Sequence, residues 1–330
     1  MPKHILQLIG STPVVELTKL GIPEGVRIFA KLEFLNPGGS IKDRMVFHIL
    51  RDAESRGKLK PGSVIVENTS GNTGAAIAMF AATFGYHAIL TMPDKVSKEK
   101  QNALKAMGAE IIVCPTSVPP ESENHYVSVA RRIHAETPDS FMLNQYDNPL
   151  NAEAHYLTTG PEIFKVFGKT ISAFVASGST GGTICGVGRF LKEKIPDISV
   201  VLLDPIGSIY HHYFHHGLVD TDLIRPYYVE GVGEDHLAKC MNFNVLTDVI
   251  QFDDQSAFQT CQKLARKEGL FCGGSSGANV WGCLELAKTI PKPAVIVTVL
   301  PDSGTKYLSK IYDDEWLAYH GFATQDVSEI

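Results

Sequence analysis

Hydrophobic residues along the chain form short runs, and longer stretches with helical spacing separate these runs. The short apolar and β-branched runs predict buried strands at Arg27–Lys31, Ser63–Val66, His87–Met92, Glu110–Cys114, Ile171–Ala176, Val200–Leu203 and Ala294–Leu300. The stretches between them predict helices near Lys42–Glu54, Asn72–Phe84, Lys98–Met107, Asn124–Glu136, Ala152–Phe167, Gly181–Lys194, Gln255–Lys267 and Ser276–Thr289. Because strands and helices alternate, we expect parallel sheets with helices on both faces, and hence an α/β fold.

The positions of the strands predict two sheets. Strands after residue 60 and before residue 145 are expected to form the first sheet, and strands after residue 170 the second. The length of 330 residues agrees with this division, because a single hydrophobic core rarely serves so long a chain.

One connection has an unusual composition. The segment Ile206–Leu218 contains the run Tyr-His-His-Tyr-Phe-His-His at Tyr210–His216. Adjacent histidines on a loop lack the ligand spacing of a helix or strand, and no cysteine or acidic residue is interleaved. We therefore predict a lid or interface loop and no metal site. The polar tail after Phe322 is expected to be frayed.

Composition and charge argue against several classes of function. Hydrophobic residues make up 44 % of the chain and charged residues 20 %, which is typical of a soluble globular protein. The net charge of -6 argues against nucleic-acid and anionic-membrane partners. No apolar run is long enough to span a bilayer and the N-terminus lacks a signal peptide, so a cytoplasmic location is expected. The six cysteines form no CxxC pair and are predicted to be free buried thiols.

A lysine follows the first glycine-rich turn. In the segment Asn36–Arg44, the residues Asn-Pro-Gly-Gly-Ser form a turn, and Lys42 is predicted to begin the next helix. The dipole at a helix N-terminus disfavours a positive charge, so this amine is easier to deprotonate and suited to forming a Schiff base. A surface lysine after a loop is the alternative, and Lys42 alone does not decide between the two.

Three further turns rich in glycine and hydroxyls occur in similar settings. Thr69–Gly74, between a strand and a helix, offers amides and hydroxyls that suit a carboxylate, although an ordinary helix cap would use one of them. Ser177–Thr183 suits a phosphate monoester, because it lacks the lysine of a P-loop and the spacing of a dinucleotide site. Gly273–Gly277 enters the last predicted helix. A lysine, a carboxylate site and a phosphate site together indicate pyridoxal 5'-phosphate as cofactor and an amino acid as substrate.

With these turns in this order, the chain resembles the fold-type-II pyridoxal phosphate enzymes, specifically the cysteine synthase and cystathionine β-synthase family. The resemblance covers about residues 8–322. Within this family, the catalytic core of cystathionine β-synthase is the most similar, on the segments Gly38–Arg44, Asp204–Ile209, Glu230–Asp235 and Leu300–Ser303. The chain departs from the family pattern at Asn68, where proline is common, and at Gly178–Ser179, where Val-Gly is usual.

The resemblance implies an architecture of two three-layer α/β/α domains with parallel-type sheets, like the tryptophan synthase β-subunit. The large domain would comprise residues 1–45 and 146–330 and bind the cofactor's phosphate and ring nitrogen. The small, mobile domain would comprise residues 46–145 and bind the substrate carboxylate. A homodimer is implied as well, and a version without haem-binding extension or regulatory repeats is expected.

The family pattern also assigns roles to matching positions. Lys42 would hold the cofactor as an internal aldimine and then carry the α-proton. The other cofactor-binding residues would be Asn72 at the ring's 3-oxygen, Ser179, Thr180, Gly181, Gly182 and Thr183 at the phosphate, and Ser275 at the ring nitrogen. The substrate carboxylate would be bound by Thr69, Ser70, Asn72, Thr73 and Gln145, with Tyr146 beside it and Gly231 in the loop at the substrate entrance.

The implied reaction is β-replacement. A hydroxyl at the ring nitrogen, as Ser275 would supply, does not keep that nitrogen protonated, which favours loss of the β-leaving group to give an α-aminoacrylate. The donor would be L-serine, O-acetylserine or O-phosphoserine, and a thiol acceptor would give cystathionine or cysteine. An amine acceptor giving a diaminopropionate-type siderophore precursor, a serine or threonine dehydratase, and a binding protein without catalysis are the alternatives.

Overall fold

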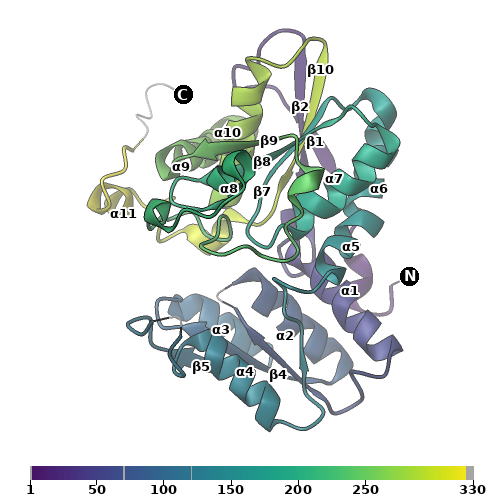
Figure 1. Cartoon of the computed structure of the whole chain (residues 1–330), viewed down its shortest axis with the longest axis vertical. Helices are drawn as coiled ribbons and strands as arrows, with labels where there is room; N and C mark the ends of the chain where they lie inside the picture. The colour runs from purple at the N-terminus through teal and green to yellow at the C-terminus, as the bar shows by residue number, and fades with distance from the viewer. Residues whose placement is uncertain (1, 70, 120, 325–330) are drawn as a thin grey trace. The chain divides into compact units, whose positions relative to one another are not determined.

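The structure is a computed structural model that describes residues 2–69, 71–119 and 121–324 (Figure 1). The described chain divides into two compact units, one made of Met1–Gly10 and Asn36–Leu150, the other of Ser11–Leu35 and Asn151–Ile330. Lys42 therefore falls in the first unit, whereas the sequence analysis placed residues 1–45 in the larger domain. The predicted Ser70 and most of the predicted frayed tail lie outside the described residues.

The strands are β1 Val14–Leu17, β2 Val26–Leu32, β3 Val64–Asn68, β4 His87–Pro93, β5 Glu110–Cys114, β6 Phe141–Met142, β7 Ala173–Ser177, β8 Ser199–Pro205, β9 Asp248–Phe252 and β10 Ala294–Leu300. The α-helices are α1 Lys42–Ser55, α2 Asn72–Phe84, α3 Lys98–Ala106, α4 Tyr126–Glu136, α5 Leu150–Leu157, α6 Thr159–Phe167, α7 Gly182–Lys194, α8 Tyr210–His216, α9 Asp254–Lys263, α10 Gly274–Ala287 and α11 Asp314–Tyr319.

The first unit contains a parallel sheet in the order β5-β4-β3-β6. From β3 to β5 the chain moves across the sheet in one direction, and it then returns to β6. Right-handed crossovers therefore place α2 and α3 on one face and α4 on the other. Helix α2 contains no charged residue and is mostly buried, and α1 packs against it. These helices make the first unit three-layered, as predicted.

The second unit contains a sheet in the order β1-β2-β10-β7-β8-β9, in which β1 alone runs antiparallel to its neighbour. The chain crosses from β7 to β9 in one direction and returns to β10 through α9 and α10. Figure 1 shows α9 and α10 on one side of this sheet and α6 and α7 on the other. The fold class predicted from the sequence, α/β with two parallel-type sheets, is confirmed.

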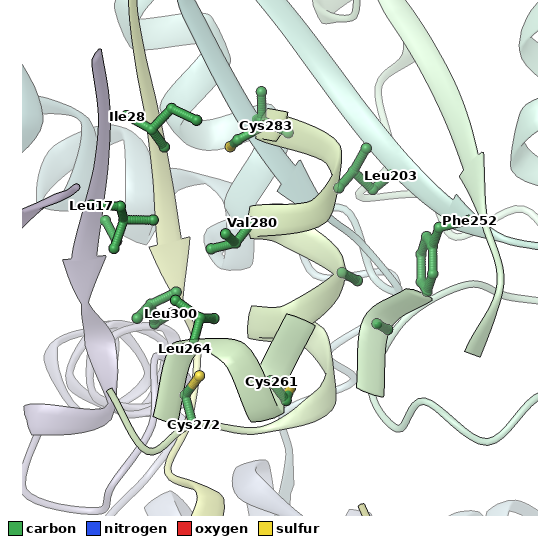
Figure 2. Close-up of a cluster of buried hydrophobic side chains, with 14 of the residues drawn as sticks. Leu17, Ile28, Leu203, Phe252, Cys261, Leu264, Cys272, Val280, Cys283 and Leu300 are labelled. Atoms are coloured by element: carbon green, nitrogen blue, oxygen red, sulfur yellow. The ribbon is translucent and has the colours of Figure 1, made fainter. Parts of the chain in front are cut away.

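Helix α10 packs on the core of the second unit. Figure 2 shows Val280 and Cys283 of α10 on the side of the helix that faces Ile28 and Leu300, with Leu203 on the other side of the helix. Glycines on α10 allow this close approach, because a Cβ on Gly282 would lie 2.3 Å from a methyl carbon of Leu203. Because α10 is packed on the sheet in this way, the position of its N-terminal end is fixed by the core of the second unit.

Most predicted elements are observed, and the differences have local causes. β5, β10 and α2 match their predicted bounds, whereas β1, β6 and β9 were not predicted. β6 has only two residues, paired with Ile65 and Val66 of β3, so its sequence carries little strand signal. The predicted helix Ala152–Phe167 is interrupted at Thr158, which has a non-helical backbone conformation and precedes α6 as its N-cap.

The histidine-rich segment is helical, so the prediction of a loop there is wrong. Helix α8 begins at Tyr210, and the backbone N–H of His211 donates to Oδ2 of Asp204 at 2.8 Å. Gly217 ends the helix with φ of 72°, a conformation that glycine adopts readily. The sequence gives α8 no apolar stripe of helical length, which is why its helical form was missed.

The cysteines are buried and form no disulfide, as predicted. Burial raises the pKa of the Cys185 thiol to about 11, so it is protonated at neutral pH. Among the described residues, no helix has the length and apolar character needed to cross a bilayer.

Candidate active site

The predicted site residues are divided between the two units, and each group is described within its own unit. Lys42, Thr69, Asn72, Thr73, Gln145 and Tyr146 belong to the first unit. Ser179, Thr180, Gly181, Gly182, Thr183, Gly231 and Ser275 belong to the second.

Lys42 is the first residue of α1, as the sequence predicts, and its side chain is half-buried. Its backbone N–H donates to Oγ of Ser40 at 3.2 Å. The helix has 14 residues, so its N-terminal dipole acts against a charged ammonium at this position. The location favours the neutral amine that attacks a carbonyl.

The turn before Lys42 is held by an acidic side chain. The backbone N–H of Gly38 donates to Oδ2 of Asp43 at 2.6 Å, and Asp43 is buried. A Cβ on Gly38 would lie 2.4 Å from Oδ1 of Asp43, so no larger residue fits. Gly39 adopts φ of 74°, in the left-handed region. The glycines therefore serve a tight turn that orients the start of α1.

The second turn joins β3 to α2, and Asn72 is the first residue of that helix. Oγ1 of Thr69 accepts hydrogen bonds from the backbone N–H groups of Gly71 and Gly74, each at 3.3 Å. A Cβ on Gly74 would lie 2.8 Å from the methyl group of Thr69. The Thr69 side chain thus organises the turn from inside, at the positively polarised end of α2. Such an end suits an anion like a carboxylate.

Gln145 is brought to this turn by a long-range hydrogen bond. Oγ1 of Thr73 donates to Oε1 of Gln145 at 2.8 Å, and both residues are buried. Because the carbonyl end of the Gln145 amide faces Thr73, the donor end is directed elsewhere. The structure therefore brings together two residues that the sequence analysis assigned to the same carboxylate.

Glu67 supports the segment that carries Gln145. It lies on β3, is fully buried, and its Oε2 accepts the backbone N–H of Asn144 at 3.0 Å. Burial raises the pKa of Glu67 to about 7, although backbone hydrogen bonds from Asn144, Gln145 and Leu143 lower it. A charged residue near the end of an otherwise apolar strand was the sequence signal for this role, and the sequence analysis missed it.

In the second unit, the Ser177–Thr183 turn is shaped by glycines. Gly181 adopts φ of 84°, and a Cβ there would lie 2.6 Å from Cα of Met241. A Cβ on Gly182 would lie 2.0 Å from Oδ1 of Asn151. The turn ends at the N-terminus of α7, which has 13 residues. Close-packed backbone at the start of a long helix suits a phosphate group, and the phosphate role of this turn stays a prediction.

The hydroxyl groups of this turn have different partners. Oγ of Ser179 donates to the Glu234 carboxylate. Oγ1 of Thr180 accepts from Nδ2 of Asn151 at 3.0 Å, so it orders the turn from within. Oγ1 of Thr183 lies 3.3 Å from Nε2 of His155. A phosphate here would therefore depend mainly on backbone N–H groups, and the direct ligand role of the Ser179 hydroxyl stays a prediction.

Two neighbouring segments hold the backbone of the same turn. The hydroxyl of Tyr210 donates to the carbonyl oxygen of Ser179 at 2.7 Å. The backbone N–H of Gly233 donates to the carbonyl oxygen of Gly178 at 2.8 Å. Gly233 adopts φ of 65°, and a Cβ there would lie 2.5 Å from Pro205. The predicted entrance loop containing Gly231, whose φ is 77°, is thus tied to the phosphate turn.

Asp204 lies at the end of β8, next to α8, and is buried. Burial raises its pKa to about 7, while hydrogen bonds from Ser208 and from the backbone of His211 and Tyr210 lower it. Its carboxyl group ties the first turn of α8 to the sheet, and so supports Tyr210.

Ser275 is the second residue of α10 and is 8 % exposed. Its hydroxyl is neutral, and the N-terminal dipole of the helix disfavours a positive charge nearby. Farther along α10, Oδ1 of Asn279 accepts from the N–H of Ser177 at 2.6 Å, and its Nδ2 donates to the carbonyl of Val299 at 2.9 Å. Asn279 therefore fixes α10 relative to the start of the phosphate turn. The sequence analysis missed it, although a buried amide in an apolar helix is a recognisable signal.

Comparisons with known proteins identify relatives of this chain. The family profile described as "Pyridoxal-phosphate dependent enzyme" matches residues 5–302. A cysteine synthase from Staphylococcus aureus (strain Mu50) is 39 % identical over 307 residues, which are 93 % of this chain and 95 % of the relative. A crystal structure of an O-acetylserine dependent cystathionine beta-synthase from Helicobacter pylori has a TM-score of 0.86 and 35 % identity, covering 95 % of this chain and 99 % of that one.

Longer relatives match as well. The cystathionine beta-synthase of Apis mellifera is 43 % identical over 320 residues, or 96 % of this chain and 63 % of the relative. The chain thus spans less than two thirds of the length of that relative.

Proposed function

Because the chain belongs to the family of pyridoxal-phosphate-dependent enzymes, with pyridoxal phosphate as its cofactor, we propose that it catalyses β-replacement on L-serine or an activated serine. The nucleophile is a thiol, and the product is cystathionine or cysteine. The names of the relatives support this reaction class, since they are cysteine synthases and cystathionine beta-synthases. The observation that carries the choice of reaction is Ser275 at the N-terminus of α10.

The residues present fit the cofactor. The backbone of the Ser177–Thr183 turn is closely packed, and Cβ atoms on Gly181 and Gly182 would collide with Met241 and Asn151. This turn would hold the phosphate, Ser275 would face the ring nitrogen, and Asn72 the ring oxygen. When bound, the cofactor supplies a carbonyl carbon for an amine and an electron-withdrawing ring that acidifies the α-carbon of the amino acid.

The chain's own groups then have separate tasks. The neutral amine of Lys42 attaches the cofactor and, when released, takes the α-proton at Nζ. The Thr69–Thr73 turn and Gln145 bind the carboxylate of the amino acid and orient it. The neutral Ser275 hydroxyl and the α10 dipole leave the ring nitrogen unprotonated, which weakens the electron sink. A weaker sink favours departure of the β-substituent over transamination.

Two other acceptors or outcomes compete with the thiol. An amine nucleophile would use the same steps up to its attack on the β-carbon. If no nucleophile adds to the β-carbon, the eliminated enamine would be released and hydrolysed to pyruvate and ammonia, which is the outcome of a dehydratase. The resemblance of the Thr69–Thr73 turn and Gln145 to the synthase pattern favours replacement over dehydration, and the hydrogen bond between Thr73 and Gln145 joins these two parts. A homodimer and a cytoplasmic location remain predictions from the resemblance and the composition.

The test is product analysis with the cofactor-loaded chain. L-serine, O-acetyl-L-serine and O-phospho-L-serine are each combined with homocysteine, sulfide or L-glutamate, and products are identified by mass spectrometry. We expect cystathionine or cysteine from at least one donor, and Lys42→Ala as the inactive control. Formation of pyruvate and ammonia as the main products would replace our proposal by a dehydratase. Failure to take up pyridoxal phosphate would leave a binding protein without catalysis.

A further inference from the structure

Helix α8 carries four histidines that have no task in the proposed reaction. His211 and His215 are four residues apart, as are His212 and His216, so each pair lies on one side of the helix. The ring centroids are 4.5 Å apart in the first pair and 4.4 Å apart in the second. Two imidazoles at this helical spacing form the arrangement that binds zinc in helical metal sites.

The pair His212–His216 has the further contact that orients a metal ligand. Nδ1 of His212 lies 3.1 Å from the carbonyl oxygen of Leu218. A carbonyl oxygen only accepts, so Nδ1 of the neutral ring carries the proton and Nε2 keeps its lone pair. Metal-binding histidines commonly donate their second nitrogen to such a carbonyl, which fixes the tautomer and the ring plane.

Accessibility also suits a cation. His215 and His216 are exposed, and His211 and His212 are half-buried. Each pair therefore has one imidazole that a hydrated ion can reach from solvent.

We propose that α8 binds a divalent transition-metal ion through the imidazoles of His212 and His216, with water in the remaining positions. The pair His211–His215 is a second, weaker clamp on the neighbouring side. Imidazole ligands suit zinc, nickel and copper, whereas magnesium and calcium require oxygen ligands. This site does not depend on the proposed reaction.

Binding there would stabilise a short helix that supports the phosphate turn. Seven residues form only a marginal helix by themselves, and a metal that bridges positions four apart holds one turn closed. The Tyr210 hydroxyl, at the start of this helix, donates to the carbonyl of Ser179. The expected effect is therefore a raised melting temperature, since a ligand that binds only the folded chain stabilises it.

The experiment is calorimetric titration of the cofactor-loaded full chain, freed of excess cofactor, with zinc chloride and, separately, nickel chloride. We expect saturable zinc binding by the native chain, a large loss of binding with His216→Gln and a smaller loss with His215→Gln. The double variant with both substitutions should show no detectable binding. Zinc should raise the melting temperature of the native chain and leave that of the double variant unchanged. Melting without metal verifies that the variants fold.

A matched control tests the other group of ligand atoms in the described residues. Glu234, Asp235 and His236 have ligand atoms within 4.8 Å of one another. His236→Gln should bind zinc as the native chain does. Native-like binding by the His215→Gln, His216→Gln double variant, or loss of binding with His236→Gln alone, would overturn the α8 site.

Discussion

The backbone N–H of Asn144 donates a hydrogen bond of 3.0 Å to Oε2 of Glu67, a carboxyl group that is only 1 % exposed. Asn144 adopts φ of 52°, in a region that residues other than glycine seldom occupy. The next residue is Gln145, which bonds Thr73 in the proposed carboxylate site. A buried carboxyl group therefore holds a strained residue beside a substrate-binding side chain.

Removing this anchor should affect substrate binding more than the chemical step. We expect Glu67→Ala to raise KM for the amino acid donor with a smaller change in kcat, and to lower the free energy of unfolding by about 1–3 kcal/mol, because buried N–H groups lose their acceptor. Glu67→Gln retains an acceptor oxygen, so its KM and its free energy of unfolding should lie between those of the native chain and Glu67→Ala. Steady-state kinetics and urea unfolding measure both effects, and an unchanged KM in Glu67→Ala would contradict this role.

The contribution of two buried carboxyl groups to stability should decrease as the pH rises from about 4 to 7. Burial raises the pKa of Glu67 from 4.5 and that of Asp204 from 3.8, each to about 7, so the folded state binds more protons than the unfolded state in this range. Each group then contributes a slope of about 1.4 kcal/mol per pH unit, and stability is greatest below the unfolded pKa values. Urea unfolding of the native chain and Glu67→Gln at several pH values isolates the share of Glu67. Parallel pH profiles for the two proteins would argue against a raised pKa.

Loss of the Lys42 amine should abolish steady-state turnover. Lys42→Ala removes both the attachment point and the base, and a positioned base alone contributes about 10²–10⁴-fold in rate. Lys42→Arg has a long basic side chain but no amine that forms a Schiff base. It serves as the control that separates loss of the amine from loss of a basic side chain. Product formation by mass spectrometry, with visible absorbance to follow the cofactor, measures the loss. Turnover near the native rate in Lys42→Ala would exclude this residue as the catalytic amine.

The phosphate turn should tolerate no side chain at Gly181. Gly181→Ala places a Cβ 2.6 Å from Cα of Met241, so the turn must open and the affinity for the cofactor must fall. Gly269→Ala is a matched control in the same unit, since Gly269 has φ of 70° and no atom near the added Cβ. In Gly269→Ala the added Cβ meets no neighbour, so the variant should lose only about 1–2 kcal/mol of stability, from the left-handed backbone conformation that alanine disfavours. Spectroscopic titration with pyridoxal phosphate compares the two, and equal affinities would argue against this turn as the phosphate site.

A carboxylate in place of Ser275 should slow β-replacement. Ser275→Asp would favour a proton on the ring nitrogen and strengthen the electron sink, while Ser275→Thr retains a hydroxyl and should keep more activity. Ser275→Asp should fold, because an acidic residue in the first turn of α10 is favoured by the helix dipole. Ser275→Thr should fold because it keeps a hydroxyl at the same position. Comparing kcat for replacement in the two variants tests the role of the hydroxyl. A Ser275→Asp enzyme as fast as the native one would contradict it.

The α/β class, most helices and strands, and the turns where chemistry is expected could all be predicted from the residues. These are local properties: apolar spacing reports burial, and glycines report turns such as Gly38–Gly39 and Gly181–Gly182. The same local reasoning placed Lys42 and Asn72 at the first residues of their helices. Family resemblance added the roles of these residues, which spacing alone left open.

The residues that support these positions from far away in the chain are found only in the folded protein. Glu67 bonds Asn144 across 77 positions, and Asn279 bonds Ser177 across 102. β6 exists because β3, more than 70 positions earlier, pairs with it, whereas Asp204, which accepts the N–H of His211 in the first turn of α8, lies only seven positions before it. Such contacts depend on buried polar groups finding partners far away in the chain, and no periodicity in the sequence encodes which partner they find.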